Sequence, residues 1–407
     1  MKSVGNWERL GMKSEWTLKK LSEIADFNPR ESLRKGTVAK KVGMDKLQPF
    51  CRDIPFYELE AYTGGTKFRN GDTIMARITP CLENGKTAKV NILEEGEIGF
   101  GSTEYIVFRA KEGVDEDFLY YLVCSSIIRE PAIKSMVGSS GRQRVQTDVV
   151  ENLDIAVPSY EEQHLIGRIL RNLDDKIKIN NKINENLEQQ IETILLKTID
   201  NANTQPVKLG DYLYIKGRIG WKGLKKSEYL PVSDYRIING ESLTLSGIDW
   251  NKAGYISAER YEESPEIMLN IGDILLSKDG TIGKIGYVDN LETPTSVASG
   301  IFVIRNTRQA EISTQFIYYL LKSRLFKAFI TSRTEGSVIP HLYQKDFTEF
   351  EFQLPSPDDM KTFDDTTAAM FSMVFSNLNE NERLIHLRDS LLPKLISGEL
   401  DISGIEI

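Results

Sequence analysis

Basic side chains recur at matching places in the two halves of this sequence. Arg77 corresponds to Lys278 and Lys86 corresponds to Lys284, in each case roughly 200 residues further along the chain. A further basic cluster in the second half has no acid among its members: Lys216, Arg218, Lys222, Lys225 and Lys226. Lysine and arginine hold phosphate groups through charge and hydrogen bonds. We therefore expect six residues to contact phosphate: Arg77, Lys86, Lys222, Lys225, Lys278 and Lys284.

A polar loop rich in glycine or serine lies near the end of each half. The first reads Gly-Ser-Ser-Gly-Arg-Gln-Arg over residues 138–144, and the second reads Gly-Ser-Val-Ile-Pro-His-Leu-Tyr over residues 336–343. Arginine and glutamine are side chains that pair with the edges of guanine and adenine. We expect base contacts from Arg142, Gln143, Arg144 and His341. A solvated basic face would explain any single patch, but repetition in both halves favours a binding surface.

The residue patterns of common catalytic sites are missing from the sequence. Asn84-Gly-Lys-Thr87 and Ile282-Gly-Lys-Ile285 lack the upstream glycine of a phosphate-binding loop. Neither a dinucleotide fingerprint nor the Asn/Asp-Pro-Pro-Tyr/Phe tetrapeptide of amino-group methyltransferases is present. The three histidines and three cysteines do not have metal-ligand spacing. We therefore expect no catalytic residue, no metal site and no cofactor in this chain.

Composition narrows the class of protein further. The net charge of −8 argues against a surface that coats nucleic acid everywhere, but it does not exclude local basic patches. The sequence has no apolar run that approaches the roughly 20 residues needed to span a membrane. The N-terminus lacks the apolar core of a signal peptide, and Cys51, Cys81 and Cys124 form no close pair. We expect a protein of the reducing cytoplasm.

The elements that must position these residues are duplicated. Phe68-Arg-Asn-Gly-Asp72 returns as Leu269-Asn-Ile-Gly-Asp273, and Phe118-Leu-Tyr-Tyr-Leu122 returns as Phe316-Ile-Tyr-Tyr-Leu320. Strands are expected at 72–76 and 105–109 with counterparts at 273–277 and 301–305, and helices at 117–129 and 314–329. Two long copies indicate a duplicated domain of mixed α+β class.

A long helical pattern follows each copy, and two asparagines interrupt each apolar seam. Asn180 and Asn184 in the first helix recur as Asn377 and Asn381 in the second. In an antiparallel coiled coil Asn180 would meet Asn381, and Asn184 would meet Asn377. A slip of one heptad would bury unpaired amides at about 1–3 kcal/mol each, so the asparagines are expected to fix the register. The alternative is two independent surface helices whose asparagines face water.

These patterns predict four segments related by an approximate two-fold axis. They are a globular domain over residues 1–158, a central spacer helix over 159–200, a second globular domain over 201–356, and a distal spacer helix with a C-terminal tail over 357–407. About 40 residues of helix make a rod of roughly 60 Å. The two helices are expected to hold two similar binding surfaces at a fixed distance.

Four segments stand out beside the duplicated layout: Val157-Pro-Ser-Tyr-Glu-Glu-Gln163, Ile177-Lys-Ile-Asn-Asn-Lys-Ile-Asn184, Leu187-Glu-Gln-Gln-Ile191 and Leu387-Arg-Asp-Ser-Leu-Leu-Pro-Lys-Leu-Ile-Ser-Gly-Glu-Leu400. In this layout and these segments, the chain from Trp16 to Leu400 resembles the specificity (S) subunit of type I restriction-modification systems. Two features depart from it. The segment Pro357–Lys361 lacks the Glu-Gln pair that precedes the first long helix. The second long helix has Arg388 at the position where the first has Ile191. We expect Arg388 to face Leu173 and to loosen the seam there.

The resemblance implies a function without catalysis in this chain. Each globular copy would be a target-recognition domain that reads one half of a bipartite, asymmetric sequence in double-stranded DNA. Two modification subunits would bind S-adenosylmethionine and methylate adenine N6, and restriction subunits would use ATP and Mg²⁺ for translocation and cleavage. No membrane is involved.

Two other classes of function stay open on the sequence alone. One is a stand-alone nuclease or methyltransferase with an unrecognised site, which metal-dependent or methyl-donor-dependent activity of the pure chain would reveal. The other is a two-ended protein scaffold, which would neither shift duplex DNA nor bind heparin in a salt-dependent way.

Overall fold

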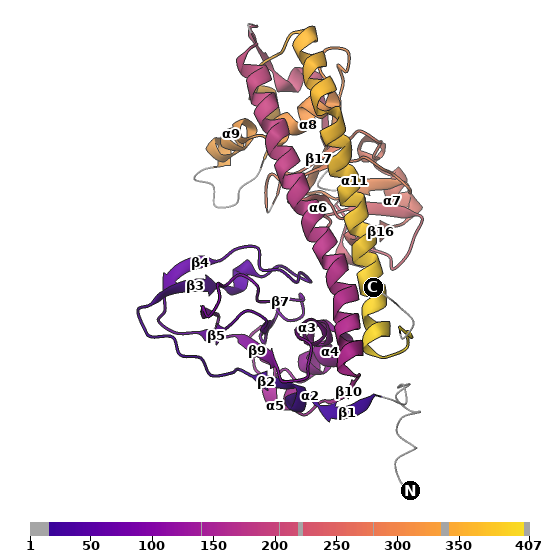
Figure 1. Cartoon of the computed structure of the whole chain (residues 1–407). Coiled ribbons are helices and arrows are strands. Elements are labelled where there is room, and N and C mark those ends of the chain that lie inside the picture. The colour runs from indigo at the N-terminus through magenta and orange to yellow at the C-terminus, as the bar shows by residue number, and fades with distance from the viewer. Residues whose placement is uncertain are drawn as a thin grey trace. The chain divides into compact units, whose positions relative to one another are not determined.

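The computed structural model describes residues 16–139, 141–202, 204–218, 223–279, 281–334 and 342–402. The chain divides into two compact units. The first unit comprises residues 1–180 and 379–407, and the second comprises residues 181–378. Each unit therefore contains one copy of the repeat and one half of each of two long helices, α6 (Tyr160–Asp200) and α11 (Pro357–Ile396) (Figure 1).

A four-stranded antiparallel sheet lies at the centre of the first unit. Its order is β2 (Ala25–Phe27), β9 (Tyr105–Ala110), β6 (Thr73–Ala76) and β7 (Thr87–Lys89). Ile74 and its partner Val107 face one core, whereas Met75 and its partner Ile106 face another. Because successive side chains of a strand point to opposite faces, this sheet is covered on both sides, and every residue of β6 is buried.

A second sheet covers one face of the central sheet. Its order is β4 (Glu58–Ala61), β3 (Val38–Val42), β8 (Gly99–Gly101) and β5 (Thr66–Phe68). Strands β3 and β8 run parallel, and the other pairs run antiparallel. Val42 and Phe68 of this sheet share a core with Ile74 and Val107 of the central sheet.

Helices cover the other face of the central sheet. They include α3 (Glu116–Cys124), α4 (Ser126–Lys134), α5 (Thr147–Glu151), and the parts of α6 and α11 that belong to this unit. Phe118, Ile166 and Leu395 meet in this core. Three shorter elements complete the unit: α2 (Leu21–Ile24), the 3₁₀ turn η1 (Met44–Lys46), and the antiparallel pair β1 (Thr17–Lys20) and β10 (Asp154–Val157).

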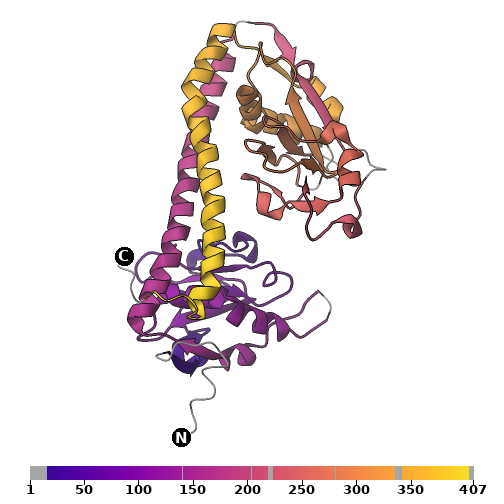
Figure 2. The same cartoon turned by 90° about the vertical axis from the view of Figure 1, so that its right-hand side faces the viewer.

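The second unit repeats this plan (Figure 2). Its central sheet has the order β12 (Leu213–Gly217), β20 (Ile301–Asn306), β17 (Ile274–Ser277) and β18 (Ile285–Tyr287). The covering sheet is β16 (Gly254–Ile256), β13 (Tyr235–Ile238) and β19 (Thr295–Val297), again with one parallel pair, β13 and β19. The two central sheets share one strand order, and this confirms the α+β duplication expected from the sequence.

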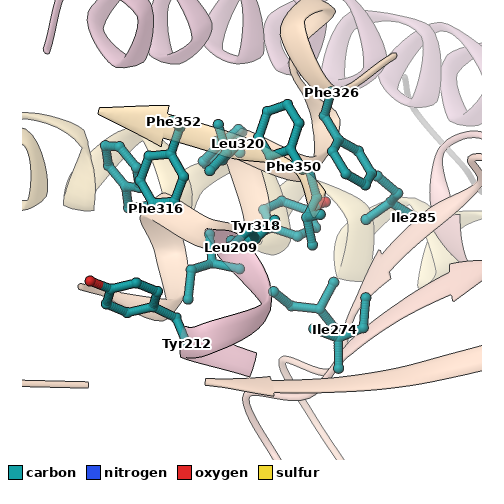
Figure 3. Close-up of a cluster of buried hydrophobic side chains, with 14 of the residues drawn as sticks. Leu209, Tyr212, Ile274, Ile285, Phe316, Tyr318, Leu320, Phe326, Phe350 and Phe352 are labelled. Atoms are coloured by element: carbon teal, nitrogen blue, oxygen red, sulfur yellow. The ribbon is translucent and has the colours of Figure 1, made fainter. Parts of the chain in front are cut away.

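The remaining elements of the second unit are short connections and covering helices. The strands are β11 (Pro206–Lys208) paired with β21 (Glu351–Gln353), and β14 (Leu243–Thr244) paired with β15 (Gly247–Ile248). The helices are η2 (Leu209–Tyr212), η4 (Lys226–Glu228), η5 (Trp250–Lys252), α7 (Ala258–Glu262), η6 (Pro265–Ile267), α8 (Thr314–Lys322), α9 (Arg324–Thr334) and α10 (Gln344–Glu349). Phe316, Tyr318 and Phe352 belong to the large aromatic core beneath these helices (Figure 3).

The two helices expected at 117–129 and 314–329 are each two helices, so that prediction was wrong in detail. The breaks fall at Ser125 and Ser323, which both have extended backbone angles. Each serine hydroxyl donates a hydrogen bond to a carbonyl three residues earlier, at Leu122 and Leu320. A serine side chain competes with the helical backbone in this way, and the chain turns before a second helix begins.

The helix seam contains a pair of hydrogen-bonded asparagines within each unit. In the first unit the Asn180 amide donates to the Asn381 side-chain oxygen at 2.9 Å and to Glu380 at 2.7 Å. In the second unit the Asn377 amide donates to the Asn184 side-chain oxygen at 2.8 Å, and Asn184 donates to the Val374 carbonyl at 3.1 Å. These are the two pairs that the antiparallel heptad register brings together.

Arg388 does not loosen the seam opposite Leu173, and that expectation was wrong. Its NH1 group lies 2.8 Å from the carboxylate of Asp174, the next residue, in a largely buried ion pair. The Tyr121 hydroxyl of α3 donates to the same carboxylate at 2.6 Å. The arginine therefore joins both helices to the globular part of the first unit, because Asp174 accepts from α11 and from α3 together.

We predict that Asn180 and Asn381 are energetically coupled. Asn180→Ala or Asn381→Ala should each lower the free energy of unfolding by about 1–3 kcal/mol, because each leaves a buried amide without its partner. The double variant should lose less than the sum, with a coupling energy of about 1 kcal/mol. Urea denaturation of the three variants measures this. Asn172→Ala, at an exposed position of α6, is the control, and strictly additive losses would contradict the coupling.

Candidate nucleic-acid interface

The polar loop of the first unit is fastened beside the turn that follows β6. Val137 and Arg144 exchange two backbone hydrogen bonds, at 3.0 and 2.9 Å, which close the loop into a hairpin. The Thr79 N–H donates to the Gln143 carbonyl at 3.0 Å, and the Val145 N–H donates to the Arg77 carbonyl at 2.9 Å. Four of the residues chosen from the sequence are thereby brought to one surface: Arg77, Arg142, Gln143 and Arg144.

Glu104 lies between the arginines of this surface. The Nε and NH2 groups of Arg144 both donate to its carboxylate, at distances between 2.6 and 3.0 Å, and the Arg77 Nε lies 3.9 Å away. The hydrogen bonds from Arg144 lower the pKa of Glu104. Such a bidentate contact fixes the plane of the Arg144 guanidinium and leaves its NH1 group available for another acceptor. Arg142 is exposed on the same loop.

Lys86 and Lys284 occupy equivalent places and make equivalent contacts. The Lys86 ammonium donates to the Met44 carbonyl at 2.7 Å, just beyond β3. The Lys284 ammonium donates to the Gly240 carbonyl at 2.8 Å, just beyond β13. Each contact ties the central sheet to the covering sheet. An ammonium group has three donors, so both lysines keep donors for a phosphate beside this structural contact.

The second unit places Lys278 where the first has Arg77. Its N–H donates to the Gly300 carbonyl at 2.9 Å, and its own carbonyl accepts from the Leu342 N–H at 3.1 Å. Its ammonium lies 4.9 Å from the centre of the Phe302 ring. Lys225 is exposed at the start of η4. Lys222 and His341, which were also chosen from the sequence, lie outside the described residues.

Three lysines near the start of the first unit are neutralised by carboxylates within the fold. Lys40 lies 2.9 Å from the carboxylate of Glu97, and Lys41 lies 2.7 Å from that of Glu60. Lys46 contacts both Asp45 and Glu58. These ion pairs hold the covering sheet together, so the three lysines are already engaged within the fold.

Sequence reasoning missed a buried arginine–aspartate pair that recurs in both units. Arg109 binds Asp72 through two hydrogen bonds of 2.7 Å, and Arg305 binds Asp273 through two of 2.8 and 3.0 Å. Both carboxylates are almost fully buried at the turn before β6 or β17. Both copies have the same Gly-Asp turn and an arginine near the end of a later strand. This repetition in the sequence could have indicated the pairs. The pairs fix the turns that start the strands leading to Arg77 and Lys278.

Two classes of site receive no support from the described part of the chain. Within it, no group of three or more histidine, cysteine or carboxylate side chains could hold a metal ion. A search of the same residues finds no helix long and apolar enough to cross a membrane. The arrangement offers cations, amides and a fixed arginine, which suit contacts with phosphate and with base edges.

Comparison with known proteins gives a consistent family. A family model described as "Type I restriction modification DNA specificity domain" matches the chain twice, over residues 13–189 and 201–385. The type I restriction enzyme MjaVIII specificity subunit of Methanocaldococcus jannaschii is 21% identical over 334 residues, which cover 76% of this chain and 76% of that protein. The type I restriction enzyme EcoAI specificity subunit of Escherichia coli is 34% identical over 201 residues, which cover 47% of this chain and 34% of that protein.

A solved structure shows the same fold. The type I restriction-modification S subunit from M. genitalium matches with a TM-score of 0.53 and 17% identity, and the match covers 97% of each chain. The likeness extends over both copies of the repeat and both long helices, so the duplicated architecture is shared along almost the whole chain.

We predict that the Glu104–Arg144 ion pair stabilises the first unit only above acidic pH. The folded-state pKa of Glu104 lies below its ordinary value of 4.5, so the unfolded chain takes up this proton first as the pH falls. The stability advantage of the wild type over Glu104→Gln should therefore be constant from about pH 6 to about pH 8 and shrink below about pH 4.5.

Thermal unfolding as a function of pH measures this difference. Glu95→Gln, which changes an exposed carboxylate, is the matched control and should show no such pH dependence. An advantage of the wild type over Glu104→Gln that persists undiminished at low pH would contradict the ion pair.

Proposed function

Because the chain belongs to the family of type I restriction-modification DNA specificity subunits, we propose that it selects a bipartite, asymmetric duplex DNA target for partner subunits. Specificity subunits are non-catalytic, and this chain supplies recognition only. The proposal places the protein in the cytoplasm, where the DNA is. Two modification subunits would bring S-adenosylmethionine for adenine-N6 methylation, and restriction subunits would bring ATP and Mg²⁺ for translocation and cleavage.

The observation that carries this proposal is the double match of the family domain to a duplicated fold. Each copy has a cation directly after the equivalent strand of its central sheet: Arg77 follows β6 and Lys278 follows β17. The copies differ in the loops around these cations, so each would read a different half of the target. Such differences suit a target whose two halves are unlike.

Recognition would combine phosphate contacts with base contacts. The phosphate set is Arg77, Lys86, Lys222, Lys225, Lys278 and Lys284, and the base set is Arg142, Gln143, Arg144 and His341. Arg144 is the strongest member of the base set, because Glu104 fixes its plane and a fixed guanidinium pairs well with the O6 and N7 atoms of guanine. Phosphate contacts would orient each domain on the duplex without reading sequence.

The long helices would serve as the spacer between two recognition domains. In this proposal residues 1–158 and 201–356 are the recognition domains, and residues 159–200 and 357–407 are the spacer helices with the C-terminal tail. Helix α6 has 41 residues and α11 has 40, which correspond to about 60 Å each. The amide pairs Asn180–Asn381 and Asn184–Asn377 would keep this spacer in a single register.

A domain exchange tests the proposal. We expect that replacing residues 1–158 with the same domain of a relative changes one half of the methylated sequence and leaves the other half intact. The measurement is N6-methyladenine mapping in cells that express the exchanged chain with its modification subunit. A change of both halves, or of neither, would argue against one domain reading one half.

We also predict that spacer length sets the gap between the half-sites. Seven residues inserted after Leu187 in α6 and after Met373 in α11 lengthen the helix pair by about 10 Å and preserve the heptad pattern. At about 3.4 Å per base pair this should widen the gap by about 3 base pairs without changing either half-site. An unchanged gap in a complex that still methylates DNA would show that the helices are not the ruler.

A further inference from the structure

We infer that the second recognition domain carries a pocket for a backbone phosphate of the DNA, formed by Lys216, Arg218 and Lys278. The inference rests on the proposed DNA-binding function and assigns one phosphate contact within it. It also predicts a difference between the two domains, because in the first domain a carboxylate neutralises the equivalent position.

The strand order brings the three residues to the same end of the central sheet. Strand β20 lies between β12 and β17 in the central sheet, and Phe302 of β20 pairs with Gly217 on one side and with Leu276 on the other. Lys216 and Arg218 flank Gly217, and Lys278 lies two residues beyond Leu276. A pocket of about 510 Å³ opens here, and its lining includes these cations together with Glu266, Phe302 and Gln344.

Gly217 makes room for the ammonium group in this pocket. A Cβ atom at this position would lie 3.4 Å from the Lys278 Nζ and 3.3 Å from the Phe302 ring. A larger side chain would therefore fill the space beside the ammonium. The glycine leaves that space open for a ligand.

One buried donor group of Arg218 lacks a hydrogen-bond acceptor among the described residues. Only 2% of its surface is exposed. Its Nε donates to the Val297 carbonyl at 3.1 Å and its NH2 donates to the Ser296 hydroxyl at 3.3 Å, while its buried NH1 has no acceptor among the described residues. A buried guanidinium donor without a partner is costly, and the negative charge of a nearby phosphate would stabilise this guanidinium.

The charges of the pocket favour an anion. Three cations line it against one carboxylate, Glu266. No carboxylate of the described residues forms an ion pair with Lys278, whose ammonium lies over the Phe302 ring instead. Burial, followed by the nearby charge of Arg260, lowers the pKa of Arg218, and the nearby Glu263 and Glu266 act in the opposite direction. A phosphate would add negative charge to this largely cationic lining.

The first domain lacks this excess of positive charge at the matching place. There the Arg77 N–H donates to the carbonyl of Glu104, and in the second domain the Lys278 N–H donates to the carbonyl of Gly300. Gly300 thus stands where the first domain has Glu104, the carboxylate that binds Arg144 and approaches Arg77. The side chain that neutralises the first site is absent from the second, so the pocket is specific to the second domain.

The test is the salt dependence of DNA binding by the complex with modification subunits, measured by fluorescence anisotropy with a duplex that carries the methylated motif. Lys216→Gln and Lys278→Gln should each make the plot of log affinity against log salt less steep, by up to about 0.9 in slope for the loss of this one phosphate contact, on specific and on unrelated duplexes alike. Arg77→Gln should lower it less, because Glu104 already offsets that charge. Lys208→Gln, on exposed strand β11, is the control and should leave the slope unchanged.

A second measurement identifies the phosphate as part of the DNA. Neutral methylphosphonate linkages, placed one at a time along the half-site that the second domain reads, should weaken wild-type binding at one position. At that position they should not weaken binding by the Lys216→Gln/Lys278→Gln double variant any further.

The outcomes separate the two claims. A wild-type complex that does not bind duplex DNA would overturn the proposed function. A wild-type complex that binds DNA, with unchanged salt slopes in Lys216→Gln and Lys278→Gln, would overturn the pocket alone. Equal thermal unfolding of these variants and the wild type confirms that the comparison is between folded proteins.

Discussion

Two pairs of hydrogen-bonded asparagines restrict how the long helices lie along each other, and much of the remaining structure depends on that restriction. An amide buried in an apolar seam is stable only opposite a partner, so Asn180 holds Asn381 in one unit and Asn184 holds Asn377 in the other. At this register Asp174 of α6 reaches Arg388 of α11. That ion pair in turn receives the Tyr121 hydroxyl of α3. The register of the helices and the attachment of the first domain are therefore linked.

The second unit attaches its domain by a different interaction, although the plan is the same. At the place of Tyr121 it has Tyr319, whose buried hydroxyl has no hydrogen-bond partner among the described residues. Phe371 stands at the place of Asp174, with its ring centre 6.0 Å from that of Tyr319. Aromatic packing thus replaces the ion pair. Met360 similarly replaces Gln163, which in the first unit bridges the Pro158 carbonyl and the Asp115 N–H.

The sequence allowed the main elements to be predicted because their signals are periodic or repeated. The duplicated strands, the long helices and the facing asparagines all follow from patterns that a single chain displays. The break at Ser125 escaped because apolar spacing continues through it, while a hydroxyl bonds to Leu122 and ends the first helix. The partner of Arg388 escaped because a heptad analysis compares seam positions only, and Asp174 lies beside the seam.

The candidate site was predictable in its residue types but not in its charge balance. Arg77 and the arginines of the 138–144 loop do lie together. Glu104, which neutralises part of that surface, is about 40 residues away in sequence from Arg144 and carries no local signal. Conversely, Gly300 in place of Glu104 leaves the second site more positive than composition indicates. Tertiary contacts determine which cations remain available to a ligand.

The most direct test of the central claim is to express the chain with the modification subunit encoded beside it and to map N6-methyladenine across the host genome. The account predicts one split motif with two different half-sites at a fixed gap, methylated on both strands. A complex that forms and binds S-adenosylmethionine but methylates no split motif would contradict the account.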